Sequence, residues 1–194
     1  MWNLAVSRGS KLEGSLMSIK LIVLLLAITC GPIWALADST REDNRLVHEG
    51  DVTAPVKDVW AAFTTKKGQE SWMVAHSEIE LKIGGRMRTH YDPKGMIGDP
   101  KTIENVIICY DPERMLSIKV TKPPEGFPFP NAVKGMWTVI YFEATSPQTT
   151  RVRIVALGFG DDEESKKMRE FFDRGNAFTL KKLQERFASK TSSK

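Results

Sequence analysis

The chain has 194 residues, of which 41% are hydrophobic and 27% charged, and its formal net charge is +4. This balance is typical of one soluble globular domain that is long enough to bury a core. After residue 37 no basic run is interleaved with aromatic residues, which argues against nucleic acid as a partner. The part that follows residue 37 has a net charge of only +2 and a single cysteine, Cys109, which excludes a disulfide framework.

The segment Met17–Ala37 differs in kind from the rest of the chain and has the pattern of a secretory signal peptide. Lys20 supplies a positive start, residues 21–28 form an unbroken apolar run, and a small-x-small triplet ends the segment. We therefore expect cleavage after Ala37 and a periplasmic or secreted protein. Residues 1–16 precede this second methionine and have the character of an upstream extension.

Two alternatives to a cleaved leader stay open at this point. A membrane anchor is disfavoured because the uncharged stretch 21–37 is slightly short for a bilayer span and is interrupted at Gly31-Pro32. Lipidation at Cys30 is disfavoured because Thr29 stands where a small residue is expected. Neither alternative changes the reading of the domain that follows.

The chain after the leader begins with a polar arm over residues 38–45 and a strand over residues 45–52. A helix follows, because Pro55 suits a first helical position and apolar residues from Val56 to Phe63 recur at helical spacing. A second short helix is predicted over residues 66–73.

Short strands separated by turn residues make up the middle of the chain. They are predicted over residues 77–83, 86–91, 101–110, 115–121, 135–145 and 151–159. Of the two longest loops between them, residues 92–100 are rich in Gly, Pro and Asp, whereas residues 122–131 hold four prolines and two phenylalanines. Short connections imply antiparallel pairing, and helices segregated from the strands imply the α+β class.

A long amphipathic helix is predicted within Gly158–Phe187. Acidic residues at its start and basic residues near its end complement the helix dipole. One stripe is apolar or small and comprises Met168, Phe171, Phe172, Gly175, Thr179, Leu183 and Phe187. Gly175 disfavours the helix by about 1 kcal/mol relative to Ala, so we expect it to leave space for a strand or a ligand.

The order of elements and several short motifs resemble the START-related SRPBCC superfamily, which shares its fold with the birch pollen allergen. Within it the chain is most similar to the domain named for activators of the ninety-kilodalton heat-shock chaperone ATPase. The resemblance covers residues 46–188, and we expect residues 189–194 to be a disordered tail. The motifs that carry it are Ala54-Pro55, Val59-Trp60, Phe63, Trp72, Ile83–Arg88, Asp111–Leu116, Trp137–Phe142 and Thr150–Val152.

The resemblance implies a helix-grip fold, in which a curved antiparallel sheet of about six or seven strands wraps the C-terminal helix around an apolar cavity. The residues it would place near that cavity are Trp72, Met87, Tyr91, Ile118, Trp137, Tyr141, Phe171, Phe172, Gly175, Asn176 and Thr179. Tyr91, Asn176 and Thr179 are the candidates for orienting a ligand through a polar contact. Phe127 and Phe129 form either a lid over the cavity or a plug at the edge of the core.

No arrangement typical of catalysis or of a metal site stands out. His48, His76 and His90 are far apart and show no ligand spacing, so we expect no metal. The acidic run at 161–164 lacks the alternating spacing of a Ca²⁺ loop and suits a helix cap. There is no phosphate-binding glycine loop, and no cofactor is expected. Two departures from the family, Ser71 and Ala156, disfavour its rarer polar or catalytic roles.

The sequence thus predicts a secreted or periplasmic protein that binds a small hydrophobic or amphipathic molecule in an internal cavity. One alternative is an enzyme of the cyclase or aromatase type, which would need an acid or base in the cavity, such as Tyr91, His90 or His76. Another is an interaction module like the chaperone-ATPase activators, which a signal peptide would disfavour. Residues 136–142 are apolar on both faces, which further suggests a homodimer through the outer face of the sheet.

Overall fold

The computed structural model describes residues 44–191, with side chains described to residue 188. The predicted leader, its upstream extension and most of the arm lie outside the described residues. No helix of the described part is both long and apolar enough to cross a membrane.

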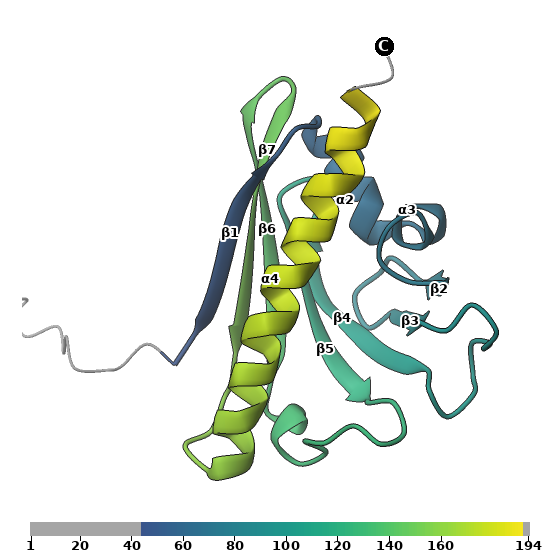
Figure 1. The fold of residues 1–194 in the computed structure, drawn as a ribbon, viewed down its shortest axis with the longest axis vertical. Helices are drawn as coiled ribbons and strands as arrows, with labels where there is room; N and C mark the ends of the chain where they lie inside the picture. The colour runs from purple at the N-terminus through teal and green to yellow at the C-terminus, as the bar shows by residue number, and fades with distance from the viewer. Residues whose placement is uncertain (1–43, 192–194) are drawn as a thin grey trace, which may run out of the picture. The chain divides into compact units, whose positions relative to one another are not determined.

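Seven strands form one sheet in the order β1-β7-β6-β5-β4-β3-β2, and every neighbouring pair is antiparallel. The strands are β1 Leu46–Val52, β2 His76–Ile79, β3 Arg86–His90, β4 Ile103–Asp111, β5 Met115–Lys122, β6 Trp137–Ser146 and β7 Thr149–Leu157. The last strand returns beside the first, so the two ends of the predicted strand series meet in the sheet (Figure 1).

Four helical segments accompany the sheet. They are α2 Val56–Thr64, α3 Lys66–Glu70, the 3-10 helix η2 Ala132–Lys134, and α4 Glu163–Thr191. Figure 1 shows α4 crossing in front of the sheet, with α2 and α3 beside its C-terminal half. The prediction of an α+β helix-grip fold with two short helices after the first strand is confirmed.

The predicted strand 77–83 is shorter in the structure, where β2 ends at Ile79. The backbone turns instead, since the N–H groups of Lys82 and Gly85 donate to carbonyls of Glu80 and Lys82. Ile83, which alternation would place with the inward set, is 71% exposed. A run of alternating apolar residues does not continue a strand when a local turn already satisfies the hydrogen-bonding groups of its backbone.

The start of α4 is fixed by a side-chain cap. Asp162 accepts hydrogen bonds from the backbone N–H of Ser165 at 3.0 Å and from its hydroxyl at 2.7 Å. These two bonds from Ser165 lower the pKa of the Asp162 carboxyl. Glu164 accepts from the backbone N–H groups of Asn131 and Ala132 and so ties α4 to η2. The acids at this end therefore cap two helices.

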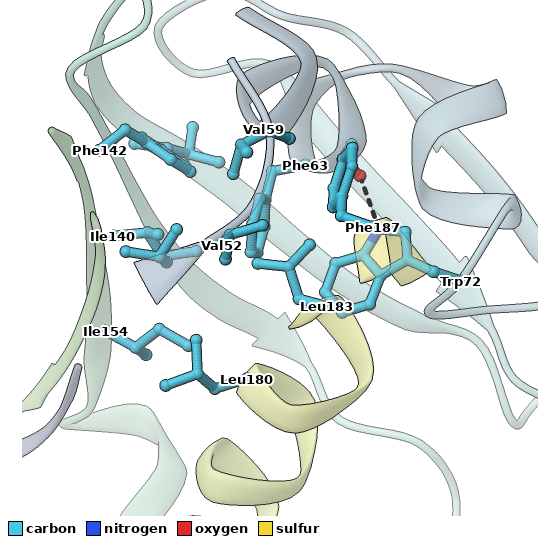
Figure 2. Packing of buried hydrophobic residues seen from close by; sticks show 14 of the residues in the cluster. Val52, Val59, Phe63, Trp72, Ile140, Phe142, Ile154, Leu180, Leu183 and Phe187 are labelled. Atoms are coloured by element: carbon cyan, nitrogen blue, oxygen red, sulfur yellow. Dashed lines mark hydrogen bonds between the residues drawn. The ribbon is translucent and has the colours of Figure 1, made fainter. Parts of the chain in front are cut away.

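The described residues contain two separate buried apolar clusters. The larger joins α2, the C-terminal half of α4 and the inner face of the sheet. Figure 2 shows Leu180, Leu183 and Phe187 of α4 in one cluster with Val59 and Phe63 of α2. The smaller comprises Leu46, Val133, Met136, Ala156, Phe159 and Met168. Because α4 is 29 residues long, it reaches both clusters.

Candidate functional site

A cavity of about 580 Å³ lies between the middle of α4 and the inner face of β3, β4, β5 and β6. Members of both apolar clusters line it, so the hollow separates the two cores. Its lining comprises Trp72, Met73, Met87, Thr89, Tyr91, Ile103, Asn105, Ile118, Val120, Pro123, Pro124, Phe127, Val133, Met136, Thr138, Phe171, Phe172, Gly175, Asn176, Phe178, Thr179 and Lys182.

Most of the residues predicted for the cavity come together there. Those that line it are Trp72, Met87, Tyr91, Ile118, Phe127, Phe171, Phe172, Gly175, Asn176 and Thr179. Trp137 and Tyr141 do not line it. They alternate along β6 with Thr138, Ile140 and Phe142, and Thr138 is the one that reaches the cavity. Both faces of this strand are apolar, so its sequence alone does not reveal which parity points inward.

Trp72 forms the boundary between the cavity and the larger core. It is 8% exposed, packs edge to face on Phe63 at 5.3 Å, and lines the cavity. Its indole N–H donates to the carbonyl of Ala62 at 3.1 Å, drawn as the dashed line in Figure 2. A buried indole without such an acceptor would be unfavourable. The bond therefore fixes the ring that closes this end of the hollow.

A cluster of four phenylalanines, three of which line the cavity, lies at another part of its wall. Phe127 and Phe129 of the proline-rich loop contact Phe171 of α4, with ring centroids 5.9 and 5.7 Å apart. Phe127 also lies 6.5 Å from Phe172. Of the two loop rings, Phe127 lines the cavity, whereas both pack against the smaller core. The loop thus has features of a lid and of a core plug at once.

Three polar residues of the sheet, together with Lys182 of α4, line the cavity without having been singled out from the sequence. Thr89, Asn105 and Thr138 lie on β3, β4 and β6. Thr89 shares a predicted strand face with Met87 and Tyr91, so its alternation was a usable signal. Asn105 and Thr138 gave no such signal, because neither strand alternates cleanly.

Asn176 carries a buried amide nitrogen that lacks a partner. Among the described residues its Nδ2 is one of three buried side-chain nitrogens without a hydrogen bond. Thr179, one turn later, donates its hydroxyl to the carbonyl of Gly175 at 2.8 Å. An unpaired buried donor is unfavourable by about 1–3 kcal/mol, and such groups need an explanation in a native structure.

Gly175 lies on the cavity wall without any steric need to be glycine. A Cβ atom built there would meet no atom within 4 Å. Of the two roles predicted for it, close approach of a strand does not apply. Its open surroundings suit the other role, which is space for a ligand.

Tyr91 stands at the cavity with 61% of the residue exposed. Desolvation by the surrounding wall raises the pKa of its phenol above the ordinary value of 10.0. A large exposed fraction and a desolvated phenol are compatible if the ring faces the cavity, where solvent can reach it although protein atoms surround it. The phenol is therefore neutral near pH 7 and can donate a hydrogen bond.

His76 and His90 do not line the cavity. His90 is 2% exposed, and its Nε2 lies 2.9 Å from Oδ1 of Asp99 in the loop that follows β3. Gly95 covers the imidazole so closely that a Cβ would lie 2.0 Å from it. The pair therefore holds this loop against β3, which carries Thr89.

The pKa of Asp99 reflects this role. Desolvation raises the pKa of Asp99, but backbone hydrogen bonds from Met96 and Lys101 and the attraction of His90 outweigh it. The pKa of the carboxyl is lowered as a result. The charged form of Asp99 is thus the form that holds the loop.

The outer face of the sheet carries a second apolar depression. This groove, about 450 Å³, is lined by Ile108, Cys109, Met115, Ser117, Lys119, Trp137, Val139 and Tyr141. Tyr141 is 46% exposed and Ile108 40% exposed. Alternate residues of β6 therefore line different sites: Thr138 lines the inner cavity, whereas Trp137, Val139 and Tyr141 line this outer groove.

The fold is that of several solved structures of low sequence identity. Protein MLL2253 from Mesorhizobium loti is 16% identical with a TM-score of 0.58, covering 75% of this chain and 97% of that one. The Aha1 dimer from Colwellia psychrerythraea is 13% identical with a TM-score of 0.57, covering 74% and 95%. Norcoclaurine synthase from Thalictrum flavum, solved with dopamine and hydroxybenzaldehyde, is 14% identical with a TM-score of 0.55, covering 77% and 88%.

Curated proteins offer no match to this chain. A family model does match, over residues 53–188, which is more than half of the chain. The predicted membership of the SRPBCC superfamily is confirmed by this match and by the shared fold. The chain belongs to the family described as Activator of Hsp90 ATPase homolog 1-like protein.

Proposed function

We propose that the protein binds a small hydrophobic or amphipathic molecule in the cavity between α4 and the sheet. The observation that carries this proposal is the hollow itself, about 580 Å³ and lined mainly by apolar and aromatic side chains. Ligand pockets typically measure about 300–1,000 Å³ and combine apolar walls with a few polar groups. Trp72, Asn176 and Tyr91 supply the fixed wall and the polar groups.

The glycine in the cavity wall, Gly175, also favours a cavity that is not filled by side chains. Protein interiors normally pack without voids, because lost contacts destabilise the fold. Here a helical glycine, which disfavours the helix, faces space in which an added Cβ atom would meet nothing within 4 Å. A protein that used this region only as core would gain stability from a side chain at Gly175.

The test is to fill the cavity. Gly175→Leu places a side chain in the hollow, whereas Ala177→Leu makes a similar change at an exposed position outside the lining. We expect an apolar fluorescent probe, 1-anilinonaphthalene-8-sulfonate, to bind the parent protein and the Ala177→Leu variant and to bind Gly175→Leu at least tenfold more weakly. Equal binding to all three would show that the probe does not use the cavity. Native mass spectrometry of protein taken from its own compartment would identify a co-purifying ligand.

The cyclase-type alternative has narrower support. Among the lining residues the titratable side chains are Tyr91 and Lys182, so an acid or base in contact with a substrate would be one of these two. The fold is shared with norcoclaurine synthase, which was solved with dopamine and hydroxybenzaldehyde. A bound ligand recovered chemically unchanged after prolonged incubation with catalytic amounts of protein would favour binding. Conversion that Tyr91→Phe abolishes would favour the enzyme.

We propose secretion or periplasmic export from the pattern of residues 17–37. Sequencing the N-terminus of protein from its native source is the test, and a start at Asp38 is the expected result. An intact leader would instead favour the activator-like reading that the family description suggests. That reading requires a measurable effect on the ATPase rate of a heat-shock chaperone.

We also propose that two copies associate through the outer groove. The exposed Tyr141 and Ile108 support this, and the Aha1 protein from Colwellia psychrerythraea, which shares the fold, is a dimer in solution. Analytical ultracentrifugation should show a dimer at tens of micromolar, roughly the range that a modest interface requires. Tyr141→Glu should give monomer, whereas Thr145→Glu on the same strand should not. Monomer in the parent protein would remove this proposal.

A further inference from the structure

The polar groups on the cavity wall restrict the class of ligand. Building on the proposed function, we propose that the cavity takes an amphipathic carboxylate that carries a second oxygen acceptor within its apolar body. In this arrangement Lys182 binds the acid group and Asn176 donates to the second oxygen. Each part rests on a separate observation.

Lys182 is the charged residue of the lining, and the described wall contains no carboxylate. Its Nζ lies 5.6 Å from the centre of the Phe178 ring. The neighbouring Lys181 is paired with Glu185 at 3.8 Å, whereas no carboxylate oxygen of residues 44–188 lies within 4 Å of the Lys182 ammonium. A cation beside an apolar hollow, without an acid of its own, favours an anionic ligand over a neutral or cationic one.

The Lys182 ammonium is exposed, and this fixes the orientation of the ligand. An acid group bound there keeps part of its hydration, so it does not suffer the full loss of solvation that a buried charge would. The aromatic surface next to it, Phe178, is 62% exposed and continues into the cavity lining. The ligand therefore enters with its apolar body first and leaves its acid group at the opening.

Asn176 sets the second requirement. Its Nδ2 is buried, faces no acceptor among the described residues, and belongs to the cavity lining. Only a donor atom is left unpaired, so the missing partner is an acceptor such as a hydroxyl, keto or ester oxygen. Six residues separate Asn176 from Lys182, which is about 9 Å along a helix axis. The second oxygen is therefore expected toward the middle of the ligand's chain, on the order of 9 Å from the acid group.

The remaining polar groups agree with this assignment. The Thr179 hydroxyl already donates to the carbonyl of Gly175, so it is available to a ligand as an acceptor. The neutral phenol of Tyr91 can donate. A volume of about 580 Å³ lies within the range of about 300–1,000 Å³ that is typical of small-molecule pockets.

The first experiment tests the charge. Binding of dodecanoate, dodecyl sulfate, dodecanol and dodecyltrimethylammonium is measured by titration calorimetry on the full mature protein. We expect dodecanoate to bind most tightly, Lys182→Gln to weaken it about fivefold and Lys182→Glu at least tenfold. Both variants should leave dodecanol within about twofold of the parent protein. The matched control, Lys181→Gln, should change neither ligand.

The second experiment tests the acceptor. Dodecanoates hydroxylated once between about carbon 5 and carbon 9 are compared with dodecanoate itself. At least one isomer should bind the parent protein about fivefold more tightly than dodecanoate, in line with one added hydrogen bond. Asn176→Leu should abolish that preference and leave dodecanoate at least as tightly bound. A buried amide that only awaits a water molecule would instead show no preference among the isomers.

The outcomes separate the two proposals. If neither dodecanoate nor dodecanol binds, the proposed function itself fails. If both bind equally and Lys182→Gln changes nothing, the cavity binds apolar molecules but the assignment of an anionic ligand is overturned. Preference for dodecyl sulfate over dodecanoate would overturn the carboxylate in particular, and absence of any isomer preference would overturn the role of Asn176.

Discussion

The C-terminal end and the middle of α4 face the same sheet but have opposite surroundings. Toward its C-terminus, Leu183 is fully buried in a cluster with side chains of α2 and the sheet. In its middle, Phe171 and Phe178 are 43% and 62% exposed and Gly175 faces open space. The difference lies in what covers the helix: side chains of α2 pack over its C-terminal end, and Val133 of η2 packs in the smaller core near its start (Figure 1). Between these two filled regions, the same helix and sheet enclose a hollow.

The largest expected effect is at the filled end. Leu183→Ala removes a fully buried side chain and should lower the free energy of unfolding by about 2–5 kcal/mol. Denaturant unfolding measures this loss. Ligand affinity extrapolated to fully folded protein should stay within about twofold, because Leu183 does not line the cavity. A loss below about 1 kcal/mol would mean that the C-terminal end and the middle of α4 do not differ in packing.

Phe172 belongs both to a packed core and to the cavity wall, so its replacement should have an intermediate effect on stability. It is half-buried, packs against the smaller core and lines the cavity. Phe172→Ala should lower the unfolding free energy by roughly half of the 3–5 kcal/mol typical of a buried Phe. It should also weaken ligand binding, unlike Leu183→Ala. If binding is unchanged, Phe172 belongs to the core alone.

Gly175→Ala should have the opposite sign. The new methyl group meets no atom within 4 Å and the helix gains about 1 kcal/mol from replacing glycine. Gly68→Ala serves as the contrast, because its Cβ would lie 1.9 Å from the carbonyl oxygen of Ala61. Thermal unfolding should show the first variant stabilised and the second destabilised. Destabilisation by Gly175→Ala would contradict an open wall.

The smallest effect concerns the loop behind the open end. The folded-state pKa of Asp99 is lowered, so its contribution to stability is present above the unfolded pKa and is lost as pH falls through the folded pKa. Thermal stability should therefore decrease between about pH 4 and lower values. Asp99→Asn should be less stable near neutral pH and show a smaller decrease on acidification. Parallel pH profiles for the two proteins would argue against a contribution of the charged Asp99 carboxyl to stability.

Periodicity and turn chemistry were sufficient to predict the architecture, because both act locally. The stripe of α4, the acids at its start and the turns between strands each correspond to an observed helix, cap or hairpin. Of the thirteen cavity and lid residues predicted from the family resemblance, ten line the one cavity in the structure. Alternation could not show which face of β6 points inward, because both faces are apolar. Trp137 and Tyr141 were therefore predicted for the cavity, although they line the outer groove.

Which parts of the interior are filled and which are open depends on how distant elements pack together. Leu183 and Gly175 lie on one helical stripe and differ in surroundings because of α2, which is more than a hundred residues away in the chain. Among the described residues, the amide nitrogen of Asn176 has no hydrogen-bond partner and the ammonium of Lys182 has no carboxylate partner. Both are likewise properties of the assembled fold, since a partner is present or absent only once distant elements have met. A local pattern specifies which side chains turn inward, whereas the packing of separate elements determines whether they touch.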